Sequence, residues 1–383
     1  MLLRAFGPFE RAWSEPLDLD EVWRLAGAFD LVPRIAGRLG PDVLRRETGE
    51  EAGERWLRTY RLTAASNLQF IAFARKLAGI AKGLGFPVAF LKGTALGLSA
   101  VVPLGWRPAC DIDLLVPPNR LEELRAALVR EGFVSSKLPG HEHQMPPLHH
   151  PSWPMVELHR HIPGLRLNGG RSSATFDDLE RLGLLEQGTQ APEGSFLPVK
   201  KVLVAHCLVH GLVQHGPAPS SYPPFRAIAD LIDLGFGDEA EPLPATFRLD
   251  RLDDEAVETA RSLVRHLMQG VTPDLVTGEA PQSRLLRHFI VGATDERYRE
   301  ALKANPRSFL GPSEKSAPLA FLSAVHHALF ISRPEVDAIY GRQKSSAGYL
   351  YRQVMRPADL LVRAVRYAIQ AVRSGRGKTE THA

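Results

Sequence analysis

The stretch FLKGTALGLSAVVPLGWRPACDIDLLV, residues 90–116, decides the fold of this chain. It joins the end of a strand-like run, a Lys-Gly-Thr turn that predicts the start of a helix, and the segment DIDLLV, which predicts a second strand. Asp111 and Asp113 open this second, otherwise apolar strand. Because carboxylates at the head of a buried strand are costly to desolvate, their presence points to something that they bind.

The flanking sequence predicts an α+β fold with a small mixed sheet. Apolar residues recur at helical spacing before the quoted stretch and again over most of the chain after it, while residues 155–159 alternate as a strand does. We therefore expect a compact α/β core at residues 84–165. A helical segment at residues 1–83 precedes it, and a mostly helical domain at residues 166–383 follows it.

Composition excludes several classes of protein. The 383 residues include 44% hydrophobic residues, and the formal net charge is only +4, so we expect a globular chain, with nucleic acid as a possible but not favoured partner. Cys110 and Cys207 form neither a disulfide framework nor a zinc motif. Because no signal-like segment or long uncharged apolar run is present, we expect no transmembrane segment and a cytoplasmic location.

The two aspartates predict a cation site. Residues i and i+2 of a strand point to the same face, so Asp111 and Asp113 project together and repel each other. A divalent cation with a preference for oxygen ligands, Mg²⁺ or Mn²⁺, removes this penalty. Glu157 lies in the alternating strand 155–159 and completes a three-carboxylate cluster if that strand neighbours the first. Two cations held in this way can support an in-line displacement at phosphorus.

The Lys-Gly-Thr turn predicts the other half of the site. Gly93 allows close approach of a ligand to the backbone, and the start of the following helix offers free N–H groups to phosphate. The Thr94 hydroxyl can donate to a phosphate oxygen, and Lys92 and Arg107 are candidate charge partners of a triphosphate or of the carboxylates. His159 shares a strand face with the third carboxylate, where it can orient that group or contact a phosphate.

These motifs resemble the DNA polymerase beta-type nucleotidyltransferase superfamily, and within it the group known only as an uncharacterised nucleotidyltransferase family. The superfamily pairs a Gly-Ser turn with an Asp-x-Asp strand and a third carboxylate on a further strand. The matching residues are FLKGTAL at 90–96, Arg107, DIDLLV at 111–116, Gly132-Phe133, VELH at 156–159 and the helical FRAIADL at 225–231. Thr94 stands where Ser is more widespread, and the third carboxylate is Glu157 rather than Asp.

The resemblance implies an enzyme that transfers a nucleotidyl group, usually from ATP, to an acceptor that the sequence leaves open between a small molecule, a peptide or protein, and RNA. It implies Asp111, Asp113 and Glu157 as catalytic and metal-binding residues. It also implies a nucleotide-binding role for Lys92, Gly93, Thr94, Arg107 and His159. For Arg107 and His159, their positions near the predicted carboxylates support the same role. The alternatives are a catalytically silent nucleotide-binding module and a toxin–antitoxin component with the same fold.

Other clusters favour structural interpretations. Six histidines between residues 141 and 161 match no zinc spacing and indicate a polar loop beside the site. His206 and His210 are expected to pack on a helix or face a pocket, with chelation of a metal as the alternative. Arg226 and Asp230 are expected to form a helical ion pair, with a role in closing the nucleotide cleft as the alternative. The amphipathic run at residues 359–373 indicates a docked helix, with binding to an anionic membrane or RNA as the alternative.

Overall fold

The computed structural model describes residues 19–136, 142–170, 172–188, 191–214, 224–238, 243–250 and 252–270, with short stretches between 280 and 286 and between 345 and 355. The chain divides into two units, residues 1–313 and 314–383, and the sheet and the candidate site both belong to the first. No helix in the described part of the chain is long and apolar enough to cross a membrane. The predicted helix at 359–373 lies outside the described residues.

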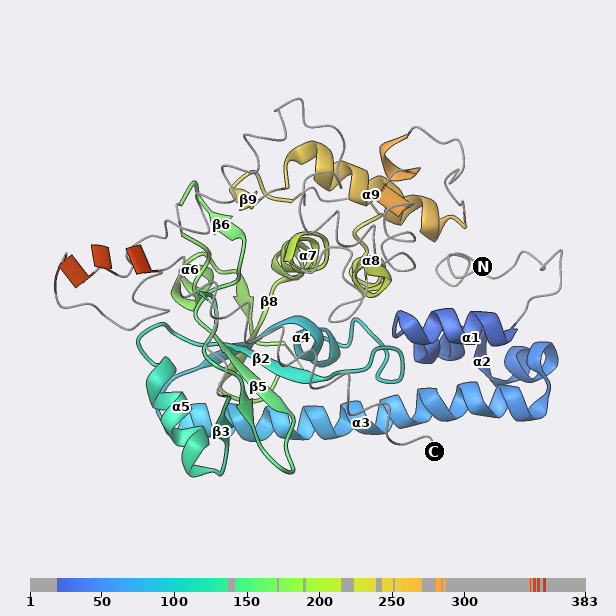
Figure 1. Ribbon diagram of the computed structural model, residues 1–383, viewed down its shortest axis with the longest axis horizontal. Coiled ribbons are helices and arrows are strands. Elements are labelled where there is room, and N and C mark those ends of the chain that lie inside the picture. The colour runs from blue at the N-terminus through green and yellow to red at the C-terminus, as the bar shows by residue number, and fades with distance from the viewer. Residues whose placement is uncertain are drawn as a thin grey trace. The chain divides into compact units, whose positions relative to one another are not determined.

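The first unit is a mixed α/β structure (Figure 1). Its elements run in the order α1 (Leu19–Ala28), α2 (Val32–Thr48), α3 (Glu50–Gly83), β1 (Val88–Phe90), α4 (Lys92–Leu98), β2 (Asp111–Leu115), α5 (Leu121–Arg130), β3 (Val134–Ser135), β4 (Leu148–His149), β5 (Met155–His159), β6 (Leu165–Leu167), α6 (Phe176–Arg181), β7 (Leu185–Glu186), β8 (Ser195–Pro198), α7 (Lys200–Leu208), the π-helix η2 (Val209–Gln214), α8 (Pro224–Asp233), β9 (Phe247–Leu249) and α9 (Asp254–Met268).

Seven strands form one mixed sheet in the order β3-β4-β5-β2-β1-β8-β7. β1 pairs antiparallel with β2 and parallel with β8, while β2 pairs parallel with β5. The sheet therefore draws strands from both sides of residue 165, and the three-part division of the chain at residues 83 and 165 remains a prediction. β6 and β9 form a separate two-stranded sheet.

The central strands are apolar because the sheet is covered on both faces. Phe90 and Leu114 belong to one buried cluster, together with the N-terminal helices, whereas Leu91 and Leu115 belong to a second cluster on the other face. Asp113 lies two residues before Leu115 and therefore on the face of the second cluster. In Figure 1, α3 runs along one side of β2 and β5, and α7 and α8 lie on the other side; α4 lies next to β2 and also contacts α3.

Glycine fixes the packing of α2 against the loop that follows α4. A Cβ atom on Gly37 would lie 2.3 Å from Nε1 of Trp106 and 2.8 Å from the ring of Tyr60, and both rings are bulky and partly buried. By contrast, a Cβ atom on Gly27 in α1 would meet nothing within 4 Å. The Trp106 loop leads directly into β2, so this contact positions the strand that carries the aspartates.

We expect Gly37→Ala to lower the free energy of unfolding by about 1–3 kcal/mol because the added methyl group overpacks this contact. The matched change Gly27→Ala should raise it by up to about 1 kcal/mol, since alanine favours a helix over glycine. Urea unfolding followed by circular dichroism measures both values. Equal effects of the two substitutions would contradict the packing described for Gly37.

Candidate functional site

The parallel pairing of β2 with β5 brings the acidic side chains together. In this register Asp113 lies opposite Glu157, and Asp111 lies opposite Met155. Because residues at i and i+2 share a face, His159 follows Glu157 on the same side of the sheet. The neighbouring position of the two strands, on which the predicted three-carboxylate cluster depended, is thus present.

Asp113 is the centre of the cluster. Its side chain is 1% exposed, and its Oδ1 atom accepts hydrogen bonds from Nζ of Lys92 and Nε2 of His159, each at 2.8 Å. Oε2 of Glu157 lies 3.8 Å from Nζ of Lys92 and 3.6 Å from Nε2 of His159. Lys92 and His159 therefore each lie close to both carboxylates in a buried site.

The buried charges stabilise one another. Burial alone would raise the pKa of Asp113, but the Lys92 charge and the His159 hydrogen bond outweigh it and hold that pKa well below its usual value. Burial would lower the pKa of Lys92 and of His159, yet the surrounding carboxylates raise both. The arrangement favours an ionised Asp113 beside a protonated Lys92, with the His159 ring donating a hydrogen bond to the same carboxylate.

Asp111 has a different environment. Its side chain is only partly buried, and burial together with the negative charge of Asp113 raises its pKa to about 6. It does not belong to the compact group of possible ligands formed by its neighbours. The sequence predicted equal roles for the two aspartates, whereas the structure places one at the centre of the cluster and the other at its edge.

The cluster has the donors that a divalent cation requires. Asp113, Glu157 and His159 each offer one ligand atom, and these atoms lie within 4.8 Å of one another. Oδ2 of Asp113 is buried and has no hydrogen-bond partner among the described atoms, so one carboxylate oxygen is available for coordination. Two carboxylates with one imidazole suit a cation such as Mn²⁺, and the carboxylates alone suit Mg²⁺. The residues present therefore fit a cation.

The Lys-Gly-Thr turn lies directly beside this cluster. Lys92 has a positive φ of 47°, a strained conformation for a residue with a side chain, and this conformation accompanies the burial of its ammonium group against Asp113. A Cβ atom on Gly93 would lie 2.1 Å from Nη1 of Arg107. Glycine at this position thus admits the Arg107 guanidinium, a use that the sequence did not reveal. The Thr94 hydroxyl lies 3.4 Å from the carbonyl oxygen of Asp111.

Helix α8 contributes Asp230, which pairs with Arg107 beside the turn. Nε of Arg107 donates to both carboxylate oxygens of Asp230, at 2.8 and 3.0 Å, and the Asp230 side chain is 2% exposed. Arg226, one turn earlier, contacts Asp30 and the carbonyl oxygen of Pro108. Residues 226 and 230 of this helix therefore make contacts with residues more than 100 positions away, and these contacts hold Arg107 against the turn; the local ion pair between the two stays a prediction.

His206 in α7, which the sequence predicted to be packed or to face a pocket, is a further residue of the site. It is 2% exposed, and neither ring nitrogen has a hydrogen-bond partner among the described atoms. It lines a small cavity of about 20 Å³ together with Lys92, Arg107, His210 and Asp230. Burial, aided by the charges of Lys92 and His159, lowers the pKa of His206 to about 3. The π-helix that begins three residues later is a rare feature that often accompanies functional sites.

The histidine-rich loop divides between two environments. The ring of His143 stacks on that of His159 with centroids 5.6 Å apart, whereas His150 packs near Phe133 and Trp153. Within the described residues, the only histidine in a group with metal-binding spacing is His159. These contacts agree with a polar loop beside the site, as the spacing indicated.

Comparison with known proteins assigns the chain to a family. The model of a family described as an uncharacterised nucleotidyltransferase matches residues 15–231, which is more than half of the chain. The match contains the turn, both strands of the cluster and most of helix α8, up to residue 231. The chain belongs to this family. No curated protein and no solved structure matches the chain.

Replacing Asp230 should destabilise the protein strongly. Asp230→Asn leaves the buried guanidinium of Arg107 without its charge partner, and breaking such a pair costs about 3–5 kcal/mol. Urea unfolding of the variant measures this loss. Glu122→Gln is the matched control, because Glu122 pairs with Arg125 on the exposed face of α5 and should contribute less than about 1 kcal/mol. A loss of similar size in both variants would contradict the special role of the buried pair.

His206 should make stability depend on pH. An unfolded chain protonates histidine with a pKa of about 6.5, whereas the folded protein does so only at about 3, so the stability falls as the pH drops below 6.5. We expect the difference in unfolding free energy between wild type and His206→Leu to shift by about 1.4 kcal/mol between about pH 7.5 and about pH 5.5. The shift should favour the variant at the lower pH. A difference that does not change with pH would show that His206 is not buried in its neutral form.

Proposed function

We propose that the protein transfers a nucleoside monophosphate group from an NTP, with ATP as the first candidate, to a hydroxyl group of an acceptor. The observation that carries this proposal is the buried group of Asp113, Glu157 and His159 beside the Lys-Gly-Thr turn. Membership of a nucleotidyltransferase family supports it independently.

The chain's own residues suggest how the reaction proceeds. Lys92 and Arg107 provide positive charge beside the turn for the phosphates, and Asp230 holds Arg107 in place. Asp113 and Glu157 would hold a divalent cation, with Asp111 at the edge of the cluster; when bound, such a cation supplies positive charge that offsets charge developing on the phosphates.

In the transfer step the acceptor oxygen forms a bond to the α-phosphorus, and the bond from that phosphorus to the bridging oxygen of the β-phosphate breaks. Pyrophosphate leaves with the bonding electron pair. The hydroxyl proton passes to a carboxylate of the cluster, for which Glu157 and Asp111 are the candidates because both are partly exposed. The NTP, the acceptor hydroxyl and this carboxylate account for every bond and proton in the step.

A second candidate function is nucleotide binding without turnover. One observation favours it: Lys92 and His159 already contact Asp113 at 2.8 Å, so the lysine charge and a histidine hydrogen bond stabilise the clustered acids even without a cation. The clustered carboxylates therefore do not by themselves require a metal. Turnover, and not binding, separates the two functions.

The test combines binding and turnover of ATP. Calorimetry with Mg²⁺ and a non-hydrolysable ATP analogue should show binding to wild type, and Asp113→Asn and Glu157→Gln should weaken metal-dependent binding or turnover by at least about 100-fold. Incubation with α-labelled ATP and a cell extract should yield a labelled product only with wild type.

Asp250→Asn is the control, because Asp250 pairs with Arg166 of the separate β6–β9 sheet. Labelled product formed equally by the Asp113 variant would refute the assigned site. Tight ATP binding without any labelled product would support the binding module instead.

A further inference from the structure

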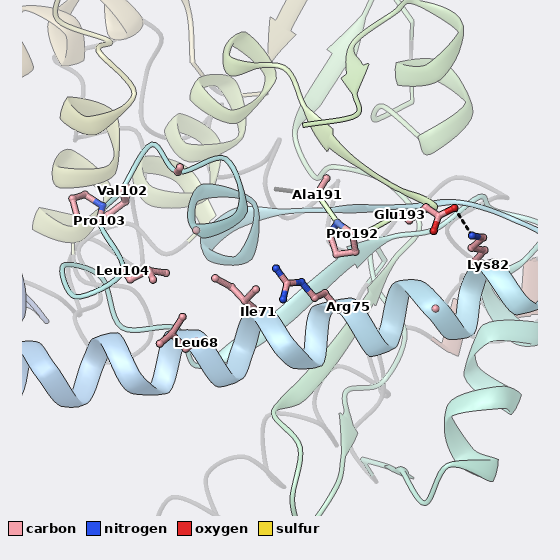
Figure 2. Close-up of a pocket in the computed structure, with 13 residues that line it drawn as sticks. Leu68, Ile71, Arg75, Lys82, Val102, Pro103, Leu104, Ala191, Pro192 and Glu193 are labelled. Atoms are coloured by element: carbon pink, nitrogen blue, oxygen red, sulfur yellow. Dashed lines mark hydrogen bonds and ion pairs between the residues drawn. The ribbon is translucent and has the colours of Figure 1, made fainter. Parts of the chain in front are cut away.

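A hollow of about 790 Å³ lies beside the proposed phosphate turn, between α3 and the segment that follows α4 (Figure 2). Its volume is in the range of sites that bind small molecules. Most of its lining is apolar, and comes from one face of α3, from the loop after α4 and from the β7–β8 connection: Leu68, Ile71, Val102, Pro103, Leu104, Ala191 and Pro192.

One cationic side chain extends into this apolar space. Figure 2 shows the Arg75 side chain on the α3 side of the hollow, with its guanidinium directed toward Ile71. No ion pair to Arg75 exists among the described residues, whereas Lys82 at the end of the hollow pairs with Glu193. Arg75 is exposed beside the apolar lining, and a guanidinium recognises a carboxylate or phosphate through two parallel hydrogen bonds. The hollow therefore suits a molecule with an apolar body and one anionic group.

The hollow adjoins the turn through a smaller cavity. This cavity, of about 30 Å³, shares Ile71, Gly97, Val102, Pro103 and Leu104 with the hollow, and its lining also includes Gly93, Thr94 and Arg107. Gly97 lies one helical turn after Gly93 on the same face of α4. A Cβ atom on Gly97 would meet nothing within 4 Å, so this face of the helix is open toward the hollow.

We infer that the hollow is the acceptor subsite of the transferase and binds an amphipathic small molecule. Its apolar body lies along α3, its carboxylate or phosphate pairs with Arg75, and its hydroxyl end points past Gly97 toward the Gly93–Thr94 turn. This inference rests on the proposed function for the identity of the ligand as an acceptor. The binding of such a molecule to the hollow is a separate claim that can be tested without turnover.

Substitutions at Gly97 and Arg75 test the hollow directly. Gly97→Leu fills the hollow from a position with free space and a helical backbone, so it should fold. Arg75→Ala removes the charge from an exposed position on α3. The matched controls are Gly27→Leu in α1, also free of contacts, and Arg58→Ala, an exposed arginine of the same helix outside the hollow.

The probe is 10-hydroxydecanoate, which combines a carboxylate, an apolar chain and a hydroxyl group. Calorimetry on the full chain should show binding to wild type, unchanged in both controls and weakened at least about 10-fold in Gly97→Leu and Arg75→Ala, which corresponds to about 1.4 kcal/mol. Decyltrimethylammonium, with the opposite charge, should bind at least about 10-fold more weakly than the carboxylate. Binding should persist when the site is saturated with a non-hydrolysable ATP analogue and Mg²⁺.

Several results would overturn the inference. These are no binding to wild type, equal binding to Gly97→Leu and Arg75→Ala, or equal binding of the cationic probe. Displacement of the probe by the ATP analogue would assign the hollow to the nucleotide instead. The proposed function fails by a different result: if the probe binds as expected but no labelled product forms from ATP with any acceptor, the hollow stands as a binding site and the transferase assignment falls.

Discussion

The site depends on the parallel register between β2 and β5, which sets Asp113 opposite Glu157 on the face of the sheet that also carries the second apolar cluster. Desolvated carboxylates at adjacent positions repel each other, and the fold tolerates them because Lys92 brings positive charge and His159 a hydrogen bond into the same space. This compensation explains the strained backbone at Lys92, since the left-handed conformation occurs where its ammonium group turns into the cluster. The four side chains form one electrostatic unit.

Around this unit the protein has a second group of buried charges that connects distant parts of the chain. Helix α8 contributes Asp230 to Arg107, Arg226 to Asp30, and Asp233 to Arg34. These contacts tie the N-terminal helices, the turn and the C-terminal part of the unit together at the edge of the site. Since buried ion pairs cost desolvation energy, their role is better understood as fixing the position of Arg107 than as adding stability.

The two ends of α4 have different environments. The helix begins at the cluster of charges, and one turn later Gly97 leaves space that continues into the apolar hollow along α3. A short helix with small residues can separate a polar reaction centre from an apolar binding surface over one helical turn. This separation allows a phosphate-binding turn and a site for an apolar molecule to lie next to each other without one disturbing the electrostatics of the other.

The sequence by itself determined the local parts of this protein: the strand–turn–helix–strand order, the shared face of Asp111 and Asp113, and the alternating strand that carries Glu157 and His159. These follow from periodicities of two and 3.6 residues, which are properties of neighbouring positions. Only the tertiary structure decided that Asp113 and not Asp111 is the centre of the cluster, that Gly93 admits Arg107, and that Asp230 and His206 belong to the site. The reason is that register, burial and pairing between residues more than 100 positions apart depend on how whole elements pack, and the local pattern of a sequence contains no record of that packing.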